Sequence, residues 1–184
     1  HVSLFQRTPN YVLPARNYPL EKKPRAWLKA NRAALRKLVQ AHDFAIPVNS
    51  PNRTYDDVPD QAERYRILEA GWETGGFRFI FETFDDIFTN ERINAEVTEF
   101  IRKKIRSIVR DPVTAELLCP KYVFGAKRPP TGTAYYESFN RHNVLLIDVR
   151  EQPIDRITRS GIKVGDQEYP FDIIIFATGF EAAT

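Results

Sequence analysis

The sequence predicts an α/β fold in which an all-helical block interrupts a domain built of strands and helices. Residues 2–6 form a short β-like run, and residues 24–118 carry apolar side chains at helical spacing. After Cys119 the pattern changes to short β-like runs, the last of which, residues 172–176, is continuously apolar. A strand, a helical block and then several strands are typical of an α/β domain that carries a helical insertion.

The first β-like run, Val2–Gln6, stops abruptly at Arg7, Thr8 and Pro9. In dinucleotide-binding βαβ units, the end of the second strand contacts the adenosine ribose, where an acid suits a 2′-hydroxyl and an Arg suits a 2′-phosphate. Arg7 supplies the charge, Thr8 supplies a hydroxyl, and no acid lies nearby in the sequence. Two interpretations stay open: an exposed strand end, or a phosphate site that makes the cofactor NADP(H) rather than NAD(H).

Helix boundaries are visible inside the helical block. Asp60 and Glu63 match a capping box at a helix start, and Gly75–Gly76 ends that segment. Asp111–Pro112 is expected to end or kink the following helix. We expect the basic side chains between residues 102 and 106 to be solvated. The clearest amphipathic stripe consists of Ile93, Val97, Phe100, Ile101, Ile105 and Ile108, after a weaker one of Trp27, Leu28, Leu35, Leu38 and Val39.

The loop at residues 124–130 places two cations, Lys127 and Arg128, between Gly125 and the pair Pro129–Pro130. The prolines stiffen the loop because they fix φ and remove backbone donors. Lys127 is a compact point charge, whereas Arg128 is a planar fork of donors that stays charged at any working pH. By chemistry alone a solvated surface pair remains the simpler interpretation, and the alternative is a site for two anionic groups.

Beyond this loop, residues 135–140 are expected to form a short helix, followed by β-like runs at 144–149, 154–158, 162–164 and 168–169. The apolar run Asp172–Phe176 predicts a strand buried on both faces. It leads into the small residues Ala177, Thr178 and Gly179, which allow a backbone to approach a ligand at the carboxyl end of a strand.

Composition excludes several classes of function. A basic segment at residues 1–42 and an acidic one at 43–100 cancel, the net charge of +3 comes from residues 101–184, and none of these segments forms a nucleic-acid-binding motif. Apolar runs are too short to cross a membrane, and one cysteine fits a reducing cytoplasm. His42, His142 and Cys119 lack partners at metal-ligand or nucleophile–base spacing, so we expect no metal site. The paired acids at 56–57 and 85–86 are expected to be loop or helix-start residues.

None of the eight glycines forms the G-x-G-x-x-G loop that cradles phosphates. The chain also begins at His1 without Met and stops soon after the apolar run at 172–176. These observations predict an internal segment of a longer polypeptide, whose remainder would be its partner.

Three separated motifs together resemble one family. They are residues 5–10 (FQRTPN), residues 124–129 (FGAKRP) with 135–144 (YYESFNRHNV), and residues 172–180 (DIIIFATGF). In this order and at about this spacing they resemble the middle of a flavin-dependent Baeyer–Villiger monooxygenase. The resemblance implies an enzyme that uses NADPH to reduce FAD and then O₂ to insert an oxygen next to the carbonyl of a ketone, giving an ester or lactone.

The resemblance also implies an organisation and roles. It divides the chain into a Rossmann-like NADP-binding domain at residues 1–20 and 121–176, a helical insertion at 21–120, and the start of the return to an FAD-binding domain at 177–184. It makes Arg128 catalytic, as the permanent cation beside a negatively charged oxygen. It makes the following residues cofactor-binding: Arg7, Thr8 and Lys127 at the 2′-phosphate, and Thr178 and Gly179 at the strand end.

Two alternatives remain beside this interpretation. An N- or S-oxygenating flavin monooxygenase would share the Ala-Thr-Gly segment at 177–179 and the use of NADPH, although the Lys127–Arg128 pair favours ketone oxidation. A non-catalytic NADP-binding or interaction module would need neither FAD nor substrate.

Overall fold

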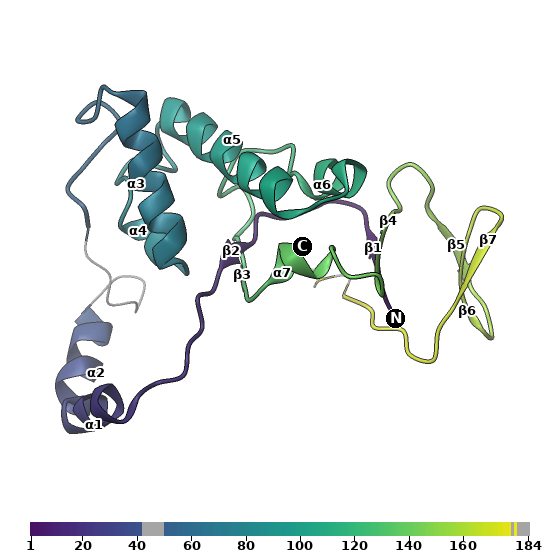
Figure 1. Ribbon diagram of the computed structural model, residues 1–184, viewed down its shortest axis with the longest axis horizontal. Coiled ribbons are helices and arrows are strands. Elements are labelled where there is room, and N and C mark those ends of the chain that lie inside the picture. The colour runs from purple at the N-terminus through teal and green to yellow at the C-terminus, as the bar shows by residue number, and fades with distance from the viewer. Residues whose placement is uncertain (42–49, 178, 180–184) are drawn as a thin grey trace, which may run out of the picture. The chain divides into compact units, whose positions relative to one another are not determined.

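The computed structural model describes residues 1–41, 50–177 and 179. The chain divides into two compact units (Figure 1). The strand unit comprises His1–Thr8 and His142–Thr184, and the helical unit comprises Pro9–Arg141. Helices and small sheets together confirm the predicted α/β class. The division between the units falls at 8/9 and 141/142, whereas the motifs suggested domain boundaries at 20/21 and 120/121.

The strand unit is centred on a parallel pair of strands, β1 (Val2–Gln6) and β4 (Val144–Asp148). Both strands lie where the sequence predicted β-like runs. Val2 lies opposite Val144, and Gln6 lies opposite Asp148. Parallel strands need a long crossover connection. Here that connection is the entire helical unit.

A three-stranded antiparallel meander follows: β5 (Ile154–Ile157), β6 (Gly161–Val164) and β7 (Gln167–Pro170). These strands match the predicted β-like runs, except that β6 begins at Gly161, one residue before the predicted run at 162–164. Phe5 of β1 packs edge-on against Tyr169 of β7, with ring centroids 5.5 Å apart. The meander therefore contacts the parallel pair through these aromatic rings.

The prediction of a strand buried on both faces at Asp172–Phe176 is wrong for the part of the chain that the structure describes. These residues belong to no strand, and Ile173, Ile175 and Phe176 are exposed, Ile175 to 84%. A central strand needs hydrogen-bonded neighbours on both edges and covering layers on both faces. Among the described residues β1 pairs with β4 alone, so the apolar run lacks both.

The helical unit contains two short strands and seven helices among its described residues. The strands β2 (Leu13–Pro14) and β3 (Thr131–Gly132) pair in parallel. The helices are α1 (Lys22–Ala30), α2 (Arg32–Ala41), α3 (Gln61–Thr74), α4 (Arg78–Phe81), α5 (Glu91–Ile108), α6 (Pro112–Leu118) and α7 (Tyr135–Ser138).

The core of the helical unit lies where α3 and α4 pack beside α5 (Figure 1). The predicted stripe on α5 is confirmed, because Ile93, Val97, Phe100, Ile101 and Ile105 are all buried. Aromatic rings fill the space between the helices: Phe79 of α4 stacks on Phe100 at 6.1 Å, and Trp72 of α3 meets both rings edge-on. By contrast, no residue of α1 or α2 is buried, and Trp27 is 57% exposed.

Local sequence sets the helix ends as expected. The Asp60 side chain accepts from Ala62 N at the start of α3, and Gly75, at φ +73°, ends that helix. Helix α5 ends at Ile108, and Asp111 then caps α6 by accepting from Thr114 N at 2.7 Å. Hydrogen bonding from the side chain and the backbone of Thr114 lowers the pKa of the Asp111 carboxyl. No helix among the described residues is long and apolar enough to cross a membrane.

The basic face of α5 is less solvated than the sequence suggested. Lys104 pairs with Glu69 of α3, and Arg102 donates twice to the Pro120 carbonyl, at 2.7 and 2.9 Å. Arg106 pairs with Glu116 of α6, which lowers the pKa of that carboxyl. These cations join α5 to its neighbours, which periodicity alone does not reveal.

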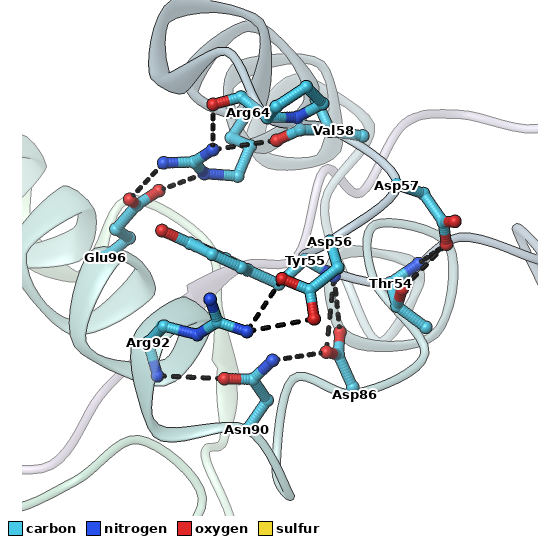
Figure 2. A network of polar contacts seen from close by, with 11 residues as sticks. Thr54, Tyr55, Asp56, Asp57, Val58, Arg64, Asp86, Asn90, Arg92 and Glu96 are labelled. Carbon is cyan, nitrogen blue, oxygen red and sulfur yellow. Dashed lines mark hydrogen bonds and ion pairs between the residues drawn. The ribbon is translucent and has the colours of Figure 1, made fainter.

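The loop before α3 is held by a tyrosine between two arginines (Figure 2). The guanidinium carbons of Arg64 and Arg92 lie 4.3 and 4.4 Å from the centre of the Tyr55 ring. Arg64 also forms a bidentate pair with Glu96 of α5, at 2.6 and 2.8 Å, and Arg92 pairs with Asp56. Each arginine is thus held by a ring and a carboxylate together.

The paired acids complete this network as loop residues. Asp86 accepts from Tyr55 N at 3.1 Å and from the Asn90 amide at 2.8 Å, as Figure 2 shows. Asp85 accepts from Arg53 N at 2.9 Å. Asp57 accepts from the backbone and hydroxyl of Thr54, both at 2.7 Å. Their role is to fix a loop, as the sequence suggested.

We expect Arg64→Met to destabilise the protein by about 3 kcal/mol, because it leaves the Glu96 carboxylate and the carbonyls of Val58 and Pro59 without their donor. The Arg64 side chain is only 5% exposed. Urea unfolding followed by circular dichroism measures this loss. The matched control is Arg66→Met on the same helix, whose side chain is 71% exposed and whose removal should cost at most about 0.5 kcal/mol. Equal urea midpoints for the two variants would contradict the assignment.

Candidate functional site

The loop at residues 124–130 starts from a deeply buried aromatic ring. Phe124 is 1% exposed and packs against Tyr11, Phe79 and Phe88, with centroid distances of 5.3, 6.1 and 5.9 Å. Phe79 and Phe88 belong to the α3–α5 block, so the loop begins inside the helical core. Burying a ring of this size holds that end of the loop firmly.

Gly125 then turns the chain away from the core. Its φ of +91° favours glycine, and a Cβ placed there would lie 2.4 Å from Cε1 of Phe88. Ala126 N donates to Val123 O at 3.2 Å and closes the turn. At the far end, Pro129 is buried, and the carbonyl of Pro130 accepts from Leu13 N at 2.9 Å. The loop is therefore fixed at both ends.

Asn94 of α5 holds the backbone at the start of the loop. Its side chain is buried, donates to Phe124 O at 2.9 Å and accepts from Phe124 N at 3.1 Å. The same amide nitrogen donates to Ile87 O at 2.9 Å. One side chain thus satisfies both backbone groups of Phe124 and ties the loop to the helical core.

The two predicted cations, Lys127 and Arg128, are both exposed and rest against aromatic rings. The Nζ atom of Lys127 lies 5.2 Å from the centre of the Tyr122 ring, and the guanidinium carbon of Arg128 lies 5.4 Å from that of Phe77. Neither cation forms a salt bridge with a carboxylate of the described residues. Their positive charge is therefore not neutralised by a described acid, unlike that of Arg64 or Arg92.

Tyr122 links this loop to the segment that follows Thr8 in the sequence. Its hydroxyl donates to Asn10 Oδ1 at 2.6 Å and also lies 3.1 Å from Pro9 O, while the Tyr11 hydroxyl donates to the Tyr122 carbonyl. The Asn10 amide donates in turn to Arg128 O at 3.3 Å. Burial raises the pKa of Tyr122 to about 12, so the ring beneath Lys127 stays neutral at physiological pH.

The remaining predicted residues lie in the strand unit. Arg7 and Thr8 follow β1 directly, and both are exposed. Gly179 is exposed at φ +87°, and no heavy atom lies within 4 Å of a Cβ built there. Thr178 lies outside the described residues. The structure thus places Lys127 and Arg128 on one anchored loop and Arg7 and Thr8 together at one strand end.

Sequence reasoning missed Asn94, Tyr122, Asn10 and Phe77. Asn94 carried a usable signal, because it lies in helical register with Val97, Ile101 and Ile105 on the buried stripe, where a polar side chain needs a specific partner. Asn10 lies inside the motif at residues 5–10, but its contact with Tyr122 and that of Phe77 with Arg128 join segments distant in sequence, so the sequence assigned none of these three residues a role.

Cys119, His142 and His42 lie outside the loop at 124–130. Cys119 is buried, which raises the pKa of its thiol and suppresses its nucleophilicity. His142 is exposed, and His42 lies outside the described residues. No cluster of potential metal ligands occurs among the residues that the structure describes. A cavity of about 100 Å³ beside β2 and β3, lined by Trp72 and Tyr136 among others, contains none of the predicted residues and is smaller than a typical ligand site.

Comparisons with known proteins converge on one group of enzymes. No family model matches the chain. It is 41% identical to a Baeyer–Villiger monooxygenase of Pseudooceanicola batsensis over 99% of its length, 39% to a cyclohexanone 1,2-monooxygenase of Acinetobacter sp. over 99%, and 37% to a phenazine N-monooxygenase of Lysobacter antibioticus over 98%. It covers 33%, 34% and 34% of these relatives respectively.

The structural comparison agrees. The crystal structure of OTEMO in complex with FAD and NADP matches 98% of the chain with a TM-score of 0.90 and 41% identity, and the chain covers 34% of it. The chain spans about one third of the length of the curated relatives that it matches. The resemblance that its motifs suggested is thus confirmed: over nearly its whole length the chain is similar to about one third of the length of enzymes named Baeyer–Villiger and cyclohexanone monooxygenases.

Proposed function

We propose that this chain is the NADP-binding part, with its helical insertion, of a complete FAD- and NADPH-dependent Baeyer–Villiger monooxygenase. Overall, a ketone, O₂, NADPH and a proton become an ester or lactone, NADP⁺ and water. The observation that carries the proposal is the loop at 124–130, which is anchored at both ends and exposes Lys127 and Arg128 without a described carboxylate partner. The identity of about 40% to enzymes of this name over nearly the whole chain supports it.

The 2′-phosphate of NADP(H) would be held by Arg7, Thr8 and Lys127. An Arg can donate two parallel hydrogen bonds to a phosphate, a Thr hydroxyl donates one, and a Lys adds a compact charge. The exposure of all three side chains supports this role. Within the helical unit, Lys127 lies over the Tyr122 ring, and the Tyr122 hydroxyl donates to Asn10. Asn10 is separated from Thr8 by a single proline.

Arg128 would act on the reaction itself. When bound, FAD supplies the electron transfer and the activation of O₂. Arg128 would hold a permanent positive charge beside the negatively charged oxygen that adds to the ketone carbonyl. An Arg suits this role because its guanidinium does not deprotonate at any working pH. Its ring partner Phe77 is apolar and does not compete for that charge as a carboxylate would.

The rest of the polypeptide would complete the enzyme. The sequence contains no G-x-G-x-x-G loop among its eight glycines, so FAD would be held mainly by residues of the remaining polypeptide. The domain assignment stays part of the proposal: residues 1–20 and 121–176 as a Rossmann-like NADP-binding domain, 21–120 as the insertion, and 177–184, with Thr178 and Gly179, as the return toward the FAD-binding domain.

N-oxygenation is a second candidate, because the phenazine N-monooxygenase matches 98% of the chain at 37% identity. Both reactions would use the same NADPH site. Assays with cyclic ketones and with aromatic N-heterocycles distinguish them: ester or lactone formation supports the first function, and N-oxide formation without ester supports the second.

We expect the complete protein to bind NADP⁺ more tightly than NAD⁺ in a calorimetric titration. Arg7→Ala and Lys127→Ala should each weaken NADP⁺ binding about ten- to a hundredfold and leave NAD⁺ binding unchanged, because each removes one charge-assisted contact to the 2′-phosphate. Lys121→Ala, an exposed cation just before the same loop, is the control and should change neither affinity. Equal affinity of the unmodified protein for both nucleotides would overturn the phosphate assignment.

We expect Arg128→Ala to lower ester formation by about a hundred- to a thousandfold, because it removes the charge that stabilises the reacting oxygen. NADPH would still be oxidised, with hydrogen peroxide as the main product. Arg128→Lys keeps the charge but not the planar fork, so its loss should be smaller. Quantifying ester and hydrogen peroxide per NADPH consumed measures the effect, with Arg110→Ala as the exposed control. Unchanged ester yield in Arg128→Ala would refute the role.

A further inference from the structure

Asn94 is a polar residue on an otherwise apolar, buried helix face. It is 8% exposed, and its neighbours on that face are Ile93, Val97 and Ile101 of α5. Burying an amide costs free energy unless its donors and acceptor find partners. Asn94 finds them: its two donated bonds reach Ile87 O and Phe124 O, and its oxygen accepts from Phe124 N. An apolar residue would fit the stripe but leave these backbone groups unpaired.

The backbone between Phe124 and the two cations has little freedom to absorb a displacement. Gly125 lies against the Phe88 ring, and the Ala126–Val123 bond closes a turn. Lys127 and Arg128 follow at once, before two prolines. A shift of the Phe124 peptide would therefore be passed on to both cations.

We propose that Asn94 is a positioning residue for the loop at 124–130. Through its bonds to the Phe124 peptide, the helical insertion sets where Lys127 meets the 2′-phosphate and where Arg128 meets the reacting oxygen. The identity of the groups that the two cations bind rests on the proposed function. The positioning of the loop rests on the hydrogen bonds between Asn94 and Phe124. The helical insertion is thus part of the cofactor site, although it contributes neither cation.

The test uses Asn94→Leu and Asn94→Asp in the complete protein. Asn94→Leu removes all three hydrogen bonds, whereas Asn94→Asp keeps an acceptor for Phe124 N but no donor. Hydrogen exchange, measured by mass spectrometry on peptides covering residues 122–130, reports loop order directly. We expect Asn94→Leu to exchange about tenfold faster there and to bind NADP⁺ about tenfold more weakly. For Asn94→Leu, the KM for NADPH should rise by a larger factor than kcat falls. The exchange rate and the NADP⁺ affinity of Asn94→Asp should lie between those of Asn94→Leu and of the unmodified protein.

Ile105→Ala is the matched control, because Ile105 is buried on the same helix about three turns further along. It should lower thermal stability without selectively freeing the loop. The proposal is overturned if Asn94→Leu leaves loop exchange and NADP⁺ affinity unchanged, or if Ile105→Ala alters both equally at a comparable loss of Tm. If Asn94→Leu does not fold, the proposal is tested with Asn94→Asp, and unchanged loop exchange and NADP⁺ affinity in that variant overturn it.

Failure of the proposed function gives a different result. If Lys127→Ala leaves NADP⁺ binding unchanged while Asn94→Leu still speeds exchange in residues 122–130, the cofactor assignment falls and the positioning of the loop by Asn94 stands.

Discussion

The backbone of the loop at 124–130 is held at both ends by hydrogen bonds, and the candidate site depends on that constraint. Asn94 satisfies the Phe124 peptide at one end, and Leu13 N binds the Pro130 carbonyl at the other. The entropy of ordering this loop is lost when the protein folds rather than when a ligand arrives, which favours binding. The helical core thus anchors the backbone that carries the two exposed side chains, Lys127 and Arg128.

The arginines of the chain differ in how completely their charge is neutralised. Arg64 and Arg92 each combine a carboxylate with the face of Tyr55, and their role is to hold a loop in place. Arg128 has an aromatic ring but no carboxylate among the described residues. A cation–π contact at an exposed site is worth about 0.5–1 kcal/mol, less than a charge-assisted bond to a phosphate or an oxyanion. An anionic ligand can therefore engage Arg128 without first breaking an ion pair.

The sequence predicted features that depend on neighbouring residues and missed those that depend on distant ones. The stripe on α5, the helix ends at Asp60 and Asp111, and the strand Val2–Gln6 follow from spacing and caps, and all appear in the structure. The run at 172–176 failed because burial of a strand requires neighbours that local pattern does not supply. At the site, the motifs identified the cations, but the contacts of Asn94 with Phe124 and of Phe77 with Arg128 span 30 residues or more, so periodicity could not assign these partners.

The parallel pairing of β1 with β4 has a consequence for how the chain folds. Val2 must find Val144, so the pairing closes a loop that contains the entire helical unit, at an entropic cost that grows with loop length. During synthesis at about 5–20 residues per second, β1 waits on the order of ten seconds for its partner. The helices rely on nearby contacts and can form within that time. The pairing of β1 with β4 therefore forms late, after the helices that lie between them in the sequence.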